Sequence, residues 1–223
     1  MTILEAIKAR HSVRQYTVRP LEAAAIAQLE QEIRECNVER DLHIQLVAGE
    51  PEAFSGAMAH YGKFTGVRNY IALVGKKRRG LEEDLGYCGQ RIALKAQMLG
   101  LNTCWVAMSF SKKKSRAEIA PGEKLVCVIA LGYGVNSGIA HKNREMETLY
   151  RAYEPLPGWF RKGMEAALLA PTAMNQQRFR FTLTEPNLVK AESTGGFYSQ
   201  IDLGIVKYHF EIGAGKENFR WLG

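Results

Sequence analysis

Residues 81–100 read LEEDLGYCGQRIALKAQMLG, and their apolar positions recur with the 3.6-residue period of an α-helix. Gly100 stands where such a helix would end. A second helix is predicted over residues 199–212, and it opens in the same way: Asp84-Leu85-Gly86 of the first corresponds to Asp202-Leu203-Gly204 of the second. Because the elements around the two helices also follow the same order, the sequence indicates a diverged internal duplication.

The other predicted elements are alternating helices and short strands. Helices are predicted over residues 3–9, from Pro20 onward and over 158–169, and strands over 43–47, 70–74, 103–107, 125–131, 179–183 and 218–222. We therefore expect an α+β fold of two sheet-and-helix halves, residues 1–150 and 151–223, packed as an intramolecular pseudo-dimer. The small residues Gly86, Gly89 and Ala93 are expected where helices meet closely.

The composition excludes several classes of protein. Among the 223 residues, 46% are hydrophobic and 24% charged, which is ordinary for a globular chain. No apolar run approaches the about 18 residues of a membrane span, and the N-terminus shows no signal core, so we expect a cytoplasmic protein without a membrane partner. The cysteines form no C-x-x-C pair and the histidines no ligand spacing, so we expect buried reduced thiols and no metal site. The cysteines are Cys36, Cys88, Cys104 and Cys127.

The formal net charge of +7 is open to three interpretations. Like-charge runs at residues 76–79 and 112–114 are typical of solvated surface. A few focused cations would also suit a small anionic ligand, and a basic surface would suit a nucleic acid. No recognition helix, zinc finger or aromatic-interleaved RNA motif accompanies the charge, so we do not expect a nucleic-acid partner.

Three short motifs carry residues suited to a small-molecule site. The first is Arg10-His11-Ser12-Val13-Arg14, where guanidinium forks and a hydroxyl suit a phosphate. The second is His141-Lys142-Asn143-Arg144, which follows a strand and the turn Gly132-Tyr133-Gly134. The third is the run APTAMNQQ at residues 170–177, in which a hydroxyl and amides offer both donors and acceptors.

Each motif also has a plainer interpretation. Basic residues after the helix at residues 3–9 would complement its dipole. Lys142 and Arg144 on a loop would be ordinary surface cations. The polar loop at residues 170–177 would cap its own backbone.

Together, R-H-S-x-R, strand-G-Y-G-loop-K-x-R and A-P-T-x-x-N-x-Q resemble the nitroreductase family of FMN flavoproteins. The order differs from that of usual members, which carry the A-P-S-x-x-N-x-Q loop about two dozen residues after the first motif. Here residues 34–41 occupy that place and do not match. The chain therefore resembles the single-chain nitroreductases, in which one polypeptide supplies both halves of a two-subunit site, and we expect a monomer that binds one FMN.

The resemblance implies a set of cofactor-binding residues. The phosphate and ribityl chain would meet Arg10, His11, Ser12, Lys142 and Arg144. Arg14 and Lys63 would lie near N1 and C2=O of the flavin. The remaining contacts would come from Trp105, Val106, Ala107, Met108, Pro171, Thr172, Ala173 and Asn175.

The resemblance also implies an enzyme in which NAD(P)H delivers hydride to flavin N5 and an electron-poor acceptor, such as a nitro compound or quinone, is then reduced. The flavin carries the chemistry, so no protein side chain is expected to be catalytic in its own right. One alternative is a flavin-binding or redox-sensing protein of the same fold that does not turn over.

Overall fold

The computed structural model describes residues 1–222, and these form two compact units. The β1–β4 unit comprises Ala9–Leu81 and Arg91–Ala140. The β5–β8 unit comprises Met1–Lys8, Glu82–Gln90 and the described chain from His141 onward. Each unit has its own four-stranded sheet, and the fold is α+β, as the sequence predicted. That residues 1–150 and 151–223 are duplicated halves stays a prediction.

The sheet of the β1–β4 unit is antiparallel, with strand order β1-β2-β4-β3. Its strands are β1 (Gln45–Val47), β2 (Asn69–Lys76), β3 (Asn102–Val106) and β4 (Glu123–Gly132). The central strands β2 and β4 are nearly continuous apolar runs because both of their faces are buried.

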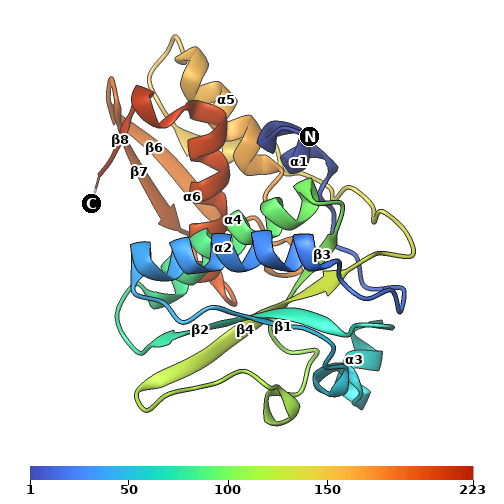
Figure 1. Ribbon diagram of the computed structural model, residues 1–223. Helices are drawn as coiled ribbons and strands as arrows, with labels where there is room; N and C mark the ends of the chain where they lie inside the picture. Colours follow the sequence, from blue (N-terminus) through green and yellow to red (C-terminus); the bar gives the residue numbers. More distant parts are fainter. Residues whose placement is uncertain (223) are drawn as a thin grey trace. The chain divides into compact units, whose positions relative to one another are not determined.

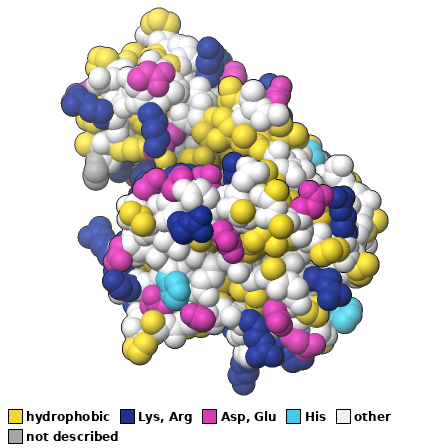
Figure 2. Space-filling model, viewed as in Figure 1, with side chains coloured by type: hydrophobic (Ala, Val, Ile, Leu, Met, Phe, Trp, Pro, Cys, Tyr) yellow, Lys and Arg dark blue, Asp and Glu magenta, His cyan; other side chains and the backbone are white. Residues whose placement is uncertain are grey.

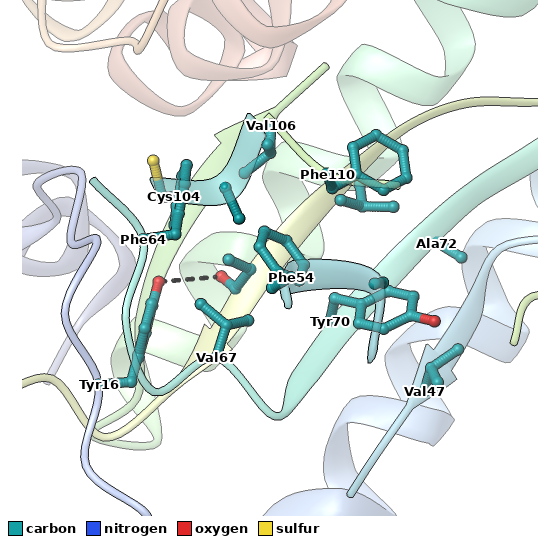
Figure 3. Packing of buried hydrophobic residues seen from close by; sticks show 14 of the residues in the cluster. Tyr16, Val47, Phe54, Phe64, Val67, Tyr70, Ala72, Cys104, Val106 and Phe110 are labelled. Atoms are coloured by element: carbon teal, nitrogen blue, oxygen red, sulfur yellow. Dashed lines mark hydrogen bonds between the residues drawn. The ribbon is translucent and has the colours of Figure 1, made fainter. Parts of the chain in front are cut away.

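The two faces of this sheet bury different groups. Tyr70, Ala72 and Val74 of β2 join a cluster with Phe54, Phe64 and Phe110 (Figure 3). The alternate residues of β2 point to the other face, because side chains alternate along a strand. Helix α2 (Ala23–Arg40) lies along the sheet in Figure 1 and buries Leu29, Ile33 and Cys36.

The sheet of the β5–β8 unit has strand order β5-β6-β7-β8, antiparallel at its centre and parallel at both edges. Its strands are β5 (Tyr150–Arg151), β6 (Phe179–Glu185), β7 (Leu188–Ser193) and β8 (Arg220–Trp221). Helices α5 (Gly158–Leu168) and α6 (Ser199–Ala214) pack on each other beside it (Figure 1). Phe210 of α6 stacks on Phe181 of β6 with ring centroids 4.6 Å apart, which ties the helices to the sheet.

The two Asp-Leu-Gly segments pack directly against each other within the β5–β8 unit. A Cβ on Gly86, in α4 (Leu81–Met98), would overlap the carbonyl oxygen of Ile201. A Cβ on Gly204 would overlap the carbonyl oxygen of Glu83 and lie 2.6 Å from the amide nitrogen of Tyr87. The expected close helix approach at Gly86 is therefore confirmed, and Gly204 is its counterpart.

Most predicted elements are present, with three omissions. The sequence did not predict β5, β7 or the short helix α3 (Ala57–Tyr61), and α1 (Ile3–Ala9) matches its prediction. The helix expected from Pro20 starts only at Ala23. Its N-cap is Glu22, whose backbone is extended, with φ −69° and ψ 140°.

Other expectations from composition can be compared directly. All four cysteines are buried, as predicted, and none of them forms a disulfide within residues 1–222. The basic runs at residues 76–79 and 112–114 are exposed, and Figure 2 shows basic and acidic side chains interspersed on one face. Within residues 1–222, no helix is long and apolar enough to cross a membrane, and no group of three or more His, Cys, Asp or Glu residues could hold a metal ion.

Candidate functional site

The segment after α1 is held extended by backbone hydrogen bonds. The amide of Val13 donates to the carbonyl of Thr103 on β3 at 3.1 Å, and the amide of Tyr16 donates to Thr65 at 2.9 Å. Thr65 returns a bond to the carbonyl of Arg14 at 3.0 Å. The R-H-S-V-R motif is thus fixed to a sheet strand and is not a mobile terminus.

Tyr16 anchors the far end of this segment in the core. Its hydroxyl donates to the carbonyl of Val13 at 2.7 Å and lies 3.3 Å from that of Ala130 (Figure 3). Burial raises the pKa of Tyr16 well above its ordinary value, so the hydroxyl remains a donor. Gly66, with φ +70°, leaves room for the backbone of Tyr16 that a Cβ would fill.

Arg10 is the most unusual residue of the motif. Its side chain is only 2% exposed, yet Nε and Nη1 have no hydrogen-bond partner among residues 1–222. Burial lowers the pKa of Arg10 to about 10, so the group is still charged at neutral pH. Thr103 Oγ1 is also buried without a partner. Orphaned donors of this kind are costly, and an anion would satisfy them.

Ser12 lies against Cys104 of β3, and His11 lies against Gly138. Burial raises the pKa of the Cys104 thiol, whereas Arg14, a hydrogen bond with Ser12 and Arg10 act in the opposite direction. His11 packs against the turn after β4, because a Cβ on Gly138 would come within 2.8 Å of the His11 Cβ.

A pocket of about 420 Å³ brings together five of the predicted site residues: Arg14, Lys63, Trp105, Val106 and Ala107. Tyr61, Gly62, Phe64 and Ser109 complete its lining. The Arg14 guanidinium lies 6.0 Å from the centre of the Phe64 ring. The lining includes two cations and no acidic side chain, so it favours a flat anionic or electron-rich ligand. Met108 is 66% exposed and does not line this pocket.

The other two motifs meet in the β5–β8 unit. The carbonyl of Lys142 accepts hydrogen bonds from Asn175 Nδ2 and Gln177 Nε2, both at 2.8 Å. Gln177 Nε2 also donates to Asn175 Oδ1 at 2.9 Å, and Gln177 Oε1 accepts from the amide of Arg144 at 2.9 Å. Gln177 is 1% exposed and therefore joins the two loops.

These bonds support the plainer interpretation for part of the 170–177 loop. The Gln177 amide serves the protein itself, and Thr172 Oγ1 accepts from the amide of Gln177 at 3.1 Å. Asn175 is exposed and keeps one free amide hydrogen and one oxygen lone pair for a ligand. Pro171 is buried, and Thr172 and Ala173 are half-buried.

Asp202 is a site residue that the sequence analysis did not assign. Its Oδ1 accepts from the amide of Ala173 at 2.9 Å, and its Oδ2 accepts from Gln176 Nε2 at 2.8 Å. Burial raises the pKa of Asp202 to about 6, although these two hydrogen bonds act to lower it. The repeated Asp-Leu-Gly sequence singled out Asp202. It did not show that Asp202 bonds to Ala173, which lies 29 residues earlier in the chain.

The sequence and the fold agree on a family. The chain belongs to the family described as "Putative TM nitroreductase", whose model matches residues 2–214. No curated protein matches the sequence significantly.

Three solved structures are similar to the chain. A "putative nitroreductase" from Thermotoga maritima is 24% identical with a TM-score of 0.70, over 97% of this chain and 85% of that one. An "FMN-dependent Nitroreductase" from Clostridium difficile is 18% identical with a TM-score of 0.51, over 62% of this chain and 91% of that one. A "putative nitroreductase in complex with FMN" from Desulfovibrio desulfuricans is 18% identical with a TM-score of 0.55, over 70% and 99%. At these identities the likeness establishes a nitroreductase-like fold.

Proposed function

We propose that this chain is an FMN-dependent oxidoreductase that takes hydride from NAD(P)H and reduces an electron-poor acceptor, such as a nitro compound or a quinone. The observation that carries the proposal is the buried, unpartnered Arg10, in the same unit as a cation-bearing aromatic pocket. Family membership and the relatives described with FMN support it.

The residues fit the phosphate end of such a cofactor. Arg10 offers two orphaned N–H donors, and Ser12 offers a half-buried hydroxyl beside it. His11 lies next to Ser12 in the chain. We also assign Lys142 and Arg144, both exposed and joined by Gln177 to the 170–177 loop, to cofactor binding. A dianionic phosphate would satisfy the buried guanidinium, whose desolvation is otherwise uncompensated.

The residues also fit the ring end. We assign Arg14 and Lys63 to the pyrimidine side of the ring, since both line the pocket. Trp105, Val106 and Ala107 line the wall of the pocket, and we assign them and the adjacent, exposed Met108 to cofactor contacts. From the β5–β8 unit, we assign Pro171, Thr172, Ala173 and Asn175 to cofactor binding.

FMN would supply the hydride-accepting chemistry when bound. The protein would then bind and orient the cofactor and polarise its ring. Positive charge beside a bound ring stabilises the negative charge that the ring gains on reduction, and solvent screens part of this effect because Arg14 and Lys63 are both exposed. Arg14 and Lys63 therefore favour the reduced cofactor.

The proposal predicts a yellow protein that NADH or NADPH bleaches under anaerobic conditions and that a nitroaromatic or a quinone restores. The measurement is the visible flavin absorbance, first after nucleotide addition and then after acceptor addition. A colourless protein that takes up no added FMN would contradict the proposal. Slow bleaching with no reoxidation by either acceptor would favour the non-catalytic flavin-binding alternative.

A further inference from the structure

The loop at residues 172–177 has a backbone that its own sequence does not favour. Met174, Asn175 and Gln177 have φ values of 51°, 53° and 45°, in the left-handed region that non-glycine residues rarely adopt. Each such residue costs free energy and persists only where surrounding contacts enforce it. The contacts that hold this loop therefore decide whether it keeps its shape.

Two separate sets of contacts hold it. At one end, the buried side chain of Gln177 bonds to the backbone of Lys142 and Arg144. At the other end, both oxygens of Asp202 are occupied, by the Ala173 amide and the Gln176 side chain. Gln176 Nε2 also donates to the carbonyl of Phe197 at 2.7 Å, so Asp202 indirectly secures the turn before α6.

We propose that Asp202 is a positioning residue that holds the 172–177 loop in its cofactor-binding shape, and that protonation of its carboxylate releases this hold. The proposal rests on the proposed function, since the loop is there assigned to FMN. A carboxylate accepts from both loop donors at once. A neutral carboxyl keeps one good acceptor and gains a hydroxyl hydrogen that meets a donor, so one of the two bonds is lost.

The release falls in an accessible pH range. The pKa of Asp202 is raised to about 6 by burial, while the bonds from Gln176 and Ala173 lower it. No charged side chain is among the causes of this shift. Charged residues on the elements next to Asp202 are Glu83 and Asp84 of α4, which packs on α6 at Gly204, Lys207 of α6, which pairs with Glu83, and Arg178, which follows the loop. Asp202 is therefore largely ionised at pH 8 and largely protonated at pH 5.

The experiment compares FMN dissociation constants of the wild type and Asp202→Asn at pH 8 and pH 5. The variant imitates the protonated state at both values. We expect it to bind about tenfold more weakly than the wild type at pH 8, as for the loss of one hydrogen bond to a charged group, and nearly equally at pH 5. The phosphate of FMN itself titrates near pH 6, and the ratio between the two proteins removes that contribution.

The matched control is Glu211→Gln, which removes another buried carboxylate of α6. Glu211 bonds to Tyr87, Trp221 and Lys216 and to no residue of the loop. Its affinity ratio to the wild type should be the same at both pH values. A constant ratio for Asp202→Asn, or convergence in the control as well, would overturn the proposal.

A second measurement is independent of flavin binding. In the apoprotein, the NMR signal of the Ala173 amide should shift with a midpoint near pH 6 in the wild type and should not titrate in Asp202→Asn. If the wild type bound no FMN at any pH, the proposed function would fail, and this titration alone would decide the role of Asp202. A flat Ala173 signal in the wild type would contradict that role.

Discussion

At the scale of single residues, Arg10 combines a cost to the apoprotein with a proposed benefit to the complex. Lowering its pKa from 12.5 to about 10 corresponds to about 3 kcal/mol of destabilisation at neutral pH. We expect Arg10→Met to raise the free energy of unfolding of the apoprotein by at least about 1 kcal/mol. Methionine keeps an apolar side chain in the place of the arginine stem and removes the buried charge. The same change should weaken FMN binding at least tenfold. Chemical denaturation and flavin titration measure the two effects.

Arg91 provides the contrast that tests this explanation. Arg91 is half-buried where Arg10 is fully buried, and its guanidinium pairs with Glu32, Glu35 and Glu39 of α2. Arg91→Met should therefore destabilise the apoprotein, since three carboxylates lose their partner. If Arg10→Met were destabilising as well, or kept its flavin, Arg10 would be a structural residue and the phosphate assignment would be wrong.

At the scale of elements, the crossing of α4 and α6 depends on two glycines. We expect Gly204→Ala to lower the stability by about 3 kcal/mol and the Tm by about 6–12 °C, because its Cβ would meet the backbone of Glu83. Gly158→Ala, at the start of α5, is the control, since its Cβ would have no neighbour within 4 Å. Thermal unfolding by circular dichroism compares them. Equal Tm values would show that the crossing tolerates a side chain.

The elements that could be predicted are those with a strong local signal. The helices α4 and α5 have a clear apolar period and end within a residue of their predictions. Strand β7, LVKAES, is mostly half-buried and polar, and its pairing with β6 is a tertiary effect that no local pattern shows. The two-residue strand β5, which was not predicted, pairs with the longer β6, and the predicted strand at residues 218–222 is present as the two residues of β8, which pair with β7.

The site was predictable in its residue types and less so in its bonding. The sequence indicated Arg14, Lys63 and residues 105–107, and the fold places them around one pocket. It did not indicate that the Gln177 side chain would form hydrogen bonds between two loops, or that Asp202 would accept a hydrogen bond from the amide of Ala173. The loop also has left-handed backbone at Met174 and Gln177, which residue preference does not predict, whereas Asn175 is of a type that tolerates it.

At the scale of the whole molecule, the chain contains one R-H-S-V-R motif and one A-P-T-A-M-N-Q-Q motif. If both belong to one cofactor, a single chain carries one complete set of binding residues, and we expect one FMN per monomer. Flavin and protein absorbance after denaturation gives the ratio, and light scattering gives the mass.

A mixing experiment separates this arrangement from a site shared between two chains. Arg10→Met and Asn175→Ala each damage one of the two motifs. In a dimer with shared sites, mixing the two variants would rebuild one intact site from the undamaged halves and restore part of the flavin binding. In a monomer every site keeps one defect, so the mixture should bind no more FMN than the average of the separate variants. Recovery on mixing, or two flavins per chain, would show that the sites are not built within single chains.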